Sequence, residues 1–180
     1  TLKTELAAAQ IANRLASAIP GTVYRIRNDG VYESVESGFS GGSTGDSYKG
    51  LQWVGSDTAS FNASQIPGWS GFCDVNTSTQ TTLETPGSAL GTTTAIRNNL
   101  YPSAPRMAIY FPDDATDYNA SIADADTLSL TGALPTRIVE HYKLAWSSYA
   151  LVVENGDLYL YYNFDPSPAA ALGTTKNLLM

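Results

Sequence analysis

The chain has 180 residues, of which 43% are hydrophobic, so it can bury a core and is not expected to be disordered. Only 15% of its residues are charged, well below the roughly 25% of an average soluble domain, and its net charge is −7. Nucleic-acid binding is not expected, because phosphate contacts need clustered Lys and Arg and the ten basic residues are scattered. No apolar run approaches the length of a membrane-spanning helix, so no membrane partner is expected either.

Residues 2–19 are predicted to form the one clear helix of the chain. Its narrow polar side consists of Lys3, Gln10, Asn13, Arg14 and Ser17. Its broad apolar side includes Leu6, Ala8, Ile11, Ala12, Leu15 and Ile19. So broad an apolar side needs cover, either from a sheet of its own domain or from another subunit. We therefore divide the chain into a docking helix at residues 1–20 and a single β-rich domain at residues 21–180.

A first hairpin is predicted at residues 22–37. A three-residue loop, Asn28-Asp29-Gly30, lets Gly30 supply the positive φ that such a turn needs. The resulting register pairs Ile26 with Tyr32, Arg25 with Glu33, and Val23 with Val35. All three pairings are chemically sensible, which favours this loop over a two-residue one.

The middle of the chain carries weaker signals. Residues 38–50 are rich in Gly and Ser and are predicted to be a flexible loop, and residues 51–54 a short strand. Residues 55–99 are predicted to form short strands and an extended loop. A buried strand is expected at residues 106–111, an acidic loop or short helix at 113–126, and a further strand at 127–130.

The strongest local signal lies at residues 142–164, where two runs of β-branched and aromatic residues flank Asn155-Gly156. A two-residue turn there would place four cross-strand pairs on one apolar face: Glu154 with Asp157, Val153 with Leu158, Leu151 with Leu160, and Tyr149 with Tyr162. That face is predicted to belong to the core of the domain. The opposite face would carry Trp146, Ala150, Val152, Tyr159 and Tyr161, and a second sheet, a neighbouring subunit or a glycan could cover it.

Together these segments predict a mainly β (α+β) chain, with an antiparallel β-sandwich or barrel-like body and one N-terminal amphipathic helix.

No catalytic constellation stands out, and neither a cofactor nor a metal is predicted. Cys73 is the only cysteine and is interpreted as a buried thiol, because the only histidine, His141, lies far away in sequence. The acidic residues of segment 113–126 could hold Ca²⁺ or form a solvated loop, but the spacing of an EF-hand is missing. We therefore do not predict an enzyme.

The aromatic residues allow a second interpretation. Trp53, Trp69, Trp146, Tyr159 and Tyr161 offer flat rings that could form a sugar platform, although core packing and subunit interfaces use the same residue types.

The whole chain resembles bacteriophage virion structural proteins in style, with a docking helix, a Ser/Thr/Gly/Asn-rich β body, an acidic balance and one cysteine. Capsid decoration (cement) proteins, tail-fibre domains and head–tail accessory subunits share this style. The opening LKTEL…IANRL…IPGTVY is similar to the helix-then-strand start of phage tail-completion proteins, from which the later Thr-rich region departs.

The resemblance implies a non-enzymatic structural protein located in a virion, assembling with copies of itself, trimers among them, and with other virion proteins. The interface candidates are Leu6, Ile11, Leu15, Ile19, Trp146, Tyr159 and Tyr161. The alternative is a secreted or extracellular carbohydrate-binding β-sandwich module, or the receptor-binding domain of a fibre.

Overall fold

The computed structural model describes residues 2–38 and 47–180, which form three α-helices and ten β-strands. The helices are α1 (Leu2–Ala16), α2 (Thr58–Phe61) and α3 (Leu90–Leu100). The strands are β1 (Tyr24–Arg27), β2 (Tyr32–Ser34), β3 (Tyr48–Ser56), β4 (Thr82–Glu84), β5 (Met107–Tyr110), β6 (Tyr118–Asp124), β7 (Thr127–Thr131), β8 (Lys143–Glu154), β9 (Asp157–Phe164) and β10 (Lys176–Leu178). Residues 39–46, most of the predicted flexible loop, lie outside the described residues.

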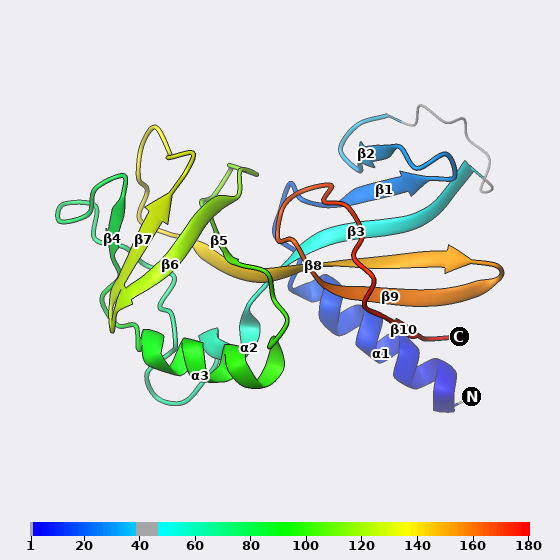
Figure 1. Cartoon of the computed structure of the whole chain (residues 1–180), viewed down its shortest axis with the longest axis horizontal. Coiled ribbons are helices and arrows are strands. Elements are labelled where there is room, and N and C mark those ends of the chain that lie inside the picture. The colour runs from blue at the N-terminus through cyan, green and yellow to red at the C-terminus, as the bar shows by residue number, and fades with distance from the viewer. Residues whose placement is uncertain (1, 39–46) are drawn as a thin grey trace.

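All strand pairs are antiparallel, and the ten strands form one open sheet in which the long strand β8 serves two lobes (Figure 1). The first residues of β8 pair with β5, and its later residues pair with β9 along the same edge. Strand β3 follows its other edge. The α1 lobe contains α1, β1–β3, β9 and β10, whereas the α3 lobe contains α2, α3 and β4–β7. The prediction of a mainly β chain with an N-terminal helix is confirmed.

The hairpin predicted around Asn155-Gly156 is confirmed as β8 and β9. Both turn residues have positive φ, 52° and 85°, as a type I′ turn requires. Glu154 faces Asp157 and Val153 faces Leu158, as predicted. The predicted pairing of Tyr149 with Tyr162 is wrong, because a bulge between Ser148 and Ala150 shifts the register by one residue.

Helix α1 lies across the first face of this hairpin. Ala7 is buried there, and Ile11 and Leu15 pack against the same cluster, which includes Trp53 and Tyr149. The prediction that this face belongs to the core is confirmed, although Val153 near the turn remains exposed. Of the two expected kinds of cover for the apolar side of α1, the structure therefore shows the sheet of its own domain, which covers part of the helix.

The second face of the hairpin is covered by the chain's own return from β9. Ala150, Val152 and Tyr161 pack with Ala170, and Leu172 is in contact with this cluster. The Nε2 of Gln52 donates to the carbonyl oxygen of Ala170 at 2.8 Å, which fixes the covering segment on the sheet. The second face of the hairpin, for which a second sheet, a neighbouring subunit or a glycan was considered, is thus covered by the irregular segment that follows β9.

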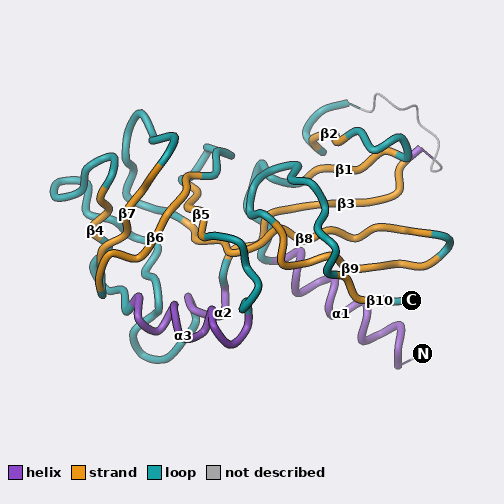
Figure 2. Tube along the Cα trace, viewed as in Figure 1, coloured by secondary structure: helices purple, strands orange, loops and turns teal. Residues whose placement is uncertain are grey.

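The α3 lobe has a separate core, although much of its chain is loop (Figure 2). Its largest cluster joins residues from β4–β8, α3 and the connecting loops: Trp69, Cys73, Leu83, Leu90, Ala104, Met107, Ile109, Phe111, Tyr118, Ala120, Leu128, Leu130, Tyr142, Leu144 and Trp146. The predicted strands at residues 106–111 and 127–130 are confirmed as β5 and β7.

Two predictions for the middle of the chain are wrong. Residues 90–99, expected to belong to short strands and an extended loop, lie in helix α3, where burial of Leu90 and Thr93 outweighs the weak helix propensity of the threonines. The later part of segment 113–126, expected to be a loop or short helix, forms strand β6, because pairing with β5 and β7 satisfies its backbone.

The first hairpin has the predicted register in β1 and β2. Ile26 faces Tyr32 and Arg25 faces Glu33, and Gly30 has a φ of 87°. The Nε of Arg25 lies 2.9 Å from the Oε2 of Glu33, so the predicted cross-strand pair is a buried ion pair.

Polar contacts join the two lobes beside β8. Arg106, immediately before β5, makes a two-pronged ion pair with Asp165, which follows β9, at 2.8 and 3.0 Å. The hydroxyl of Tyr110 donates to the carbonyl oxygen of Pro166 at 2.6 Å. Side-chain contacts therefore hold the two lobes together in addition to strand β8, which both lobes share.

Candidate functional site

The interface candidates on α1 fall into three environments. Leu6 is exposed, Ile11 and Leu15 are half-buried against the sheet, and Ile19 is buried beyond the end of the helix. Ile19 packs with Val54, Ala108, Tyr110 and Ala145 where the lobes meet. Of the four, Leu6 therefore offers the most surface to a partner.

The three aromatic candidates do not share one face. Trp146 is buried in the core of the α3 lobe, where its Nε1 donates to the Oδ2 of Asp57 at 3.1 Å. Tyr159 and Tyr161 lie in the α1 lobe, and the Nζ of Lys176 stands 4.3 Å from the ring centroid of Tyr159. The hydroxyl of Tyr161 donates to Glu154.

The predicted sugar platform does not assemble from these rings. Trp53, Trp69 and Trp146 are only 0%, 3% and 8% exposed, so their faces pack against the chain's own core. Of the five rings, only that of Tyr159 is half-buried rather than buried, and the Nζ of Lys176 already lies over it.

The orientation of α1 was not foreseen. The helix buries a stripe centred on Ala7, Ile11 and Leu15, while Ala9, Ala12 and Ala16 on its far side are exposed. The predicted polar side therefore lies along a flank of the helix rather than opposite the buried stripe. Toward its C-terminal end, this polar flank faces the α3 lobe.

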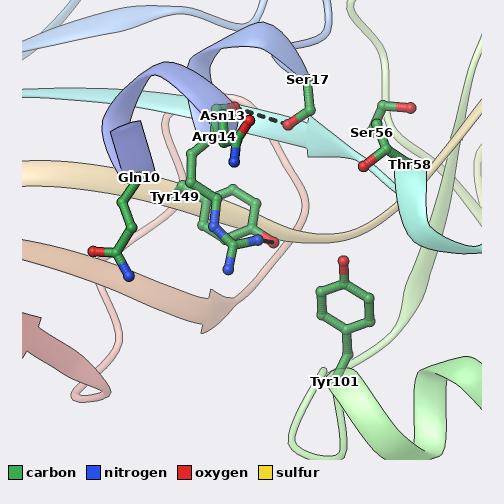
Figure 3. A pocket seen from close by; sticks show the side chains of 8 residues that line it. All are labelled: Gln10, Asn13, Arg14, Ser17, Ser56, Thr58, Tyr101 and Tyr149. Carbon is green, nitrogen blue, oxygen red and sulfur yellow. Dashed lines mark hydrogen bonds between the residues drawn. The ribbon is translucent and has the colours of Figure 1, made fainter. Parts of the chain in front are cut away.

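A pocket of about 400 Å³ lies between this polar flank and the α3 lobe (Figure 3). Four of its residues come from the polar side of the helix region and four from β3, α2, β8 and the end of α3: Gln10, Asn13, Arg14, Ser17, Ser56, Thr58, Tyr101 and Tyr149. We call it the inter-lobe pocket. Its volume is in the range typical of small-molecule sites.

Arg14 is held in place within this pocket. Its guanidinium carbon lies 4.9 Å from the centroid of the Tyr149 ring, and its Nη1 donates to the Tyr149 hydroxyl at 3.3 Å. The carbonyl oxygen of Arg14 accepts from the Nε1 of Trp53 at 3.1 Å and from the hydroxyl of Ser17 at 2.8 Å. The backbone N–H of Ser17 also donates to this carbonyl oxygen, at 3.3 Å, so the two side-chain bonds supplement a long backbone bond at the helix end.

The two tyrosines of the pocket keep their protons at neutral pH. Burial raises the pKa of Tyr149 and, more mildly, that of Tyr101, and the nearby carboxylate of Asp57 acts in the same direction in both. The Tyr101 ring projects from the end of α3 with its hydroxyl toward Tyr149 (Figure 3). It is therefore a neutral phenol on the side of the pocket formed by the α3 lobe.

Asp57 is buried near the pocket and its oxygens are already engaged. Its Oδ1 accepts from the backbone N–H of Ser60 at 3.1 Å, which caps α2, and its Oδ2 accepts from Trp146. The Asp57 carboxylate thus stabilises the junction of the lobes through these hydrogen bonds and does not line the pocket.

A second cavity, of about 380 Å³, continues from the inter-lobe pocket. Ser17, Ser56 and Thr58 line both cavities. The second adds Phe61, Trp69, His141 and Lys143 among its lining residues. A ligand longer than one ring would therefore find an adjoining space along the junction of the lobes.

Cys73 and His141, distant in sequence, are brought onto neighbouring segments, since Phe72 bridges His141. The Cys73 thiol is nevertheless buried and donates to the carbonyl oxygen of Val139 at 2.9 Å. Burial, with smaller contributions from Glu140 and Asp74, raises its pKa to about 11, so a nucleophilic thiolate is not favoured.

The acidic segment does not converge on one point. Asp117 pairs with Arg106, Asp114 accepts from the Tyr118 hydroxyl at 2.7 Å, and Asp124 accepts from the N–H of Asp126 at 3.1 Å. Over residues 2–38 and 47–180, no cluster of three or more His, Cys, Asp or Glu side chains could hold a metal ion.

Sequence reasoning noticed Gln10, Asn13, Arg14 and Ser17 only as a solvated polar side. The breadth of the apolar side of the helix could have identified them. One sheet covers only part of so broad a side, and the polar residues then lie beside the buried stripe rather than opposite it. Tyr101 carried no comparable signal, since its approach to α1 depends on helix α3.

None of the helices in the described part of the chain is long and apolar enough to cross a membrane. The chain matches no family model, and neither the curated proteins nor the solved structures contain a significant match to it.

Proposed function

We propose that this chain is a non-enzymatic structural subunit of a bacteriophage virion that self-associates through the exposed side of α1. The observation that carries the proposal is a set of exposed apolar side chains beside the N-terminal half of the helix. Leu2, Leu6, Leu178 and Met180 are 72%, 61%, 56% and 46% exposed. We call these four residues the terminal patch.

The terminal patch is continuous across two elements. Leu2 and Leu6 are one helical turn apart on α1. Leu6 and Leu178 line one groove of about 360 Å³ between α1 and β10, and α1 and β10 lie side by side (Figure 1). Solvent-exposed apolar groups that gather in this way are typical of interaction sites.

A second copy of the chain is the occupant that this surface favours. Beside the terminal patch, the far side of α1 carries the small residues Ala9, Ala12 and Ala16, preceded by the exposed Glu5, so two such helices can approach closely along the part that follows Glu5. Helix α1 is about 22 Å long, too short to provide the roughly 800 Å² per partner of a standard interface. The terminal patch and the edge strand β10 would supply the remainder.

Sedimentation velocity over a range of concentrations tests self-association. We expect an oligomer for the unchanged chain and a monomer with an unchanged circular dichroism spectrum for Leu6→Asp, since a charge would be buried at the interface. Ile66→Asp is the matched control, because Ile66 is equally exposed but lies in the α3 lobe. A monomeric unchanged chain at every concentration, or equal effects of both substitutions, would contradict the proposal.

The virion part of the proposal has its own test. Mass spectrometry of purified particles should detect the chain in a fixed copy number. Its presence in infected cells together with its absence from particles would count against a structural role in the virion.

A further inference from the structure

The inter-lobe pocket is rich in hydrogen-bond donors and has a single charge. Its lining combines a guanidinium, two amides, three aliphatic hydroxyls and two phenols: Arg14; Gln10 and Asn13; Ser17, Ser56 and Thr58; Tyr101 and Tyr149. No carboxylate is among the residues that line it. Such a lining is complementary to a ligand that offers many acceptors and carries a negative charge.

Arg14 has capacity left for such a ligand. In the described part of the chain it forms no ion pair; its side chain donates to the Tyr149 hydroxyl and also interacts with the Tyr101 hydroxyl. A guanidinium has five N–H donors, so most of them remain for an incoming acceptor. The carboxylate of Asp57, which is buried near the pocket, already accepts hydrogen bonds from Ser60 and Trp146.

The guanidinium is also preorganised. It rests on the Tyr149 ring, and that ring is buried and in turn packed against Gly55, where a Cβ would come within 2.4 Å of Cε2. A cation fixed in this way loses less side-chain entropy on binding than one on an unsupported chain.

We infer that the inter-lobe pocket binds an acidic sugar residue, with its carboxylate on Arg14. Arg–carboxylate contacts are charge-assisted and can be bidentate. The amides of Gln10 and Asn13 and the neighbouring hydroxyls are suited to the hydroxyl groups of the ring, and Tyr101 lies across the pocket from Arg14 (Figure 3). The cavity shared through Ser17, Ser56 and Thr58 gives the next sugar of an oligosaccharide a place.

This ligand differs from the occupant of the assembly surface. Self-association uses the terminal patch, at the N-terminal half of α1, whereas the carboxylate of the sugar would lie on Arg14, toward the other end of the helix. Gln10 lines both the groove of the terminal patch and the inter-lobe pocket, but Leu6 lines only the groove and Arg14 only the pocket. Leu6→Asp and Arg14→Gln therefore test the two activities separately.

Isothermal titration with defined oligosaccharides tests the inference. A glucuronate-containing disaccharide and a sialic-acid-terminated trisaccharide are the acidic probes, and the corresponding neutral disaccharide and inorganic sulfate are the comparisons. We expect at least one acidic probe to bind about tenfold or more tightly than either comparison, because a charge-assisted contact is lost in the neutral sugar and the ring contacts are lost in sulfate. Equal binding of the neutral sugar or of sulfate would overturn the assignment.

Two arginine variants locate the site. Arg14→Gln should weaken binding of the acidic sugar about tenfold or more while leaving the thermal midpoint of unfolding nearly unchanged, because Gln retains helix propensity. Arg137→Gln, at an exposed arginine in the α3 lobe, should leave binding unchanged. Unaltered binding by the Arg14 variant, or an absence of binding to every acidic probe on a glycan array, would refute the site.

Discussion

Arg106 contacts two carboxylates, that of Asp117, 11 positions away, and that of Asp165, 59 positions away. Its guanidinium contacts Asp165 through both prongs and Asp117 through Nη2. Hydrogen bonds from Arg106 are the main reason that the pKa of Asp165 is lowered, with Ser167 adding to the effect. Both partners are partly exposed, so solvent screening limits the contribution of the pair to roughly 1 kcal/mol.

The lowered pKa of Asp165 predicts how stability changes with pH. A carboxyl group whose pKa is lower in the folded chain contributes stability that is complete above its unfolded pKa of about 3.9 and is lost as the pH falls through the folded value. We expect Asp165→Asn to lower the free energy of unfolding at pH 7 and to reduce its decline below pH 4. Urea titrations of both proteins at pH 7 and at about pH 3 measure this difference. An equal decline in both would contradict the prediction.

At the scale of single residues, sequence reasoning was strongest where the partner is local. The buried Arg25–Glu33 pair followed from the register of a three-residue loop, and both turn residues of the second hairpin followed from their types. The neighbours of Trp146 could not be foreseen, because the side chain of Asp57 reaches it across 89 positions.

Among the elements, the junction of β3 and α1 depends on one small residue. Gly55 lies in β3 beside a register shift, opposite Ser147 of β8. A Cβ at this position would come within 2.4 and 2.8 Å of the Tyr149 ring, which is packed between the sheet and α1. The ring, and with it the support of Arg14, would have to move.

We therefore expect Gly55→Ala to lower the free energy of unfolding by roughly 1–3 kcal/mol, as overpacking of a core does. Gly91→Ala is the matched control, because nothing lies within 4 Å of its Cβ position and Ala is favoured in a helix. This control should be neutral or stabilising by up to about 1 kcal/mol. Chemical denaturation measures both, and equal stabilities of the two variants would show that the ring adapts without cost.

The elements that sequence patterns predicted share a strong local signal. Helix α1 and the two hairpins have clear periodicity or turn residues, and β5 is a compact apolar run. Helix α3 and strand β6 lack such signals, because Thr-rich and Asp-rich segments favour loops locally and take their form from tertiary contacts. The inter-lobe pocket depends on both α1 and α3, so only its α1 half was visible in the sequence.

On the scale of the whole molecule, the lobes have separate cores but one continuous strand. Trp53 belongs to the cluster beneath α1, whereas Trp69 and Trp146 belong to the α3 lobe. Since β8 completes the sheet of both lobes, loss of one removes pairing partners of the other. We expect a single cooperative unfolding transition.

Tryptophan fluorescence can follow each lobe separately. Trp53→Phe leaves the reporters of the α3 lobe, and the double variant Trp69→Phe with Trp146→Phe leaves the reporter of the α1 lobe. Within each variant, the midpoint from fluorescence should coincide with that from far-ultraviolet circular dichroism, whatever the change in overall stability. A separation of the two midpoints would mean that the lobes unfold independently.

The double use of β8 also bears on which length changes the chain can accommodate. At the middle of the strand, the Ser147 hydroxyl accepts from the N–H of Phe164, and the Ser148 hydroxyl donates to the carbonyl oxygen of Asp165 at 2.7 Å. Inserting or deleting one residue there would turn every later side chain of β8 to the opposite face. An insertion at the exposed turn after Glu154 only lengthens the loop, because the strand pairs on either side of it can keep their register. Natural variation and protein engineering can therefore change the length of the chain at the turn of this hairpin, but hardly at all in the middle of β8.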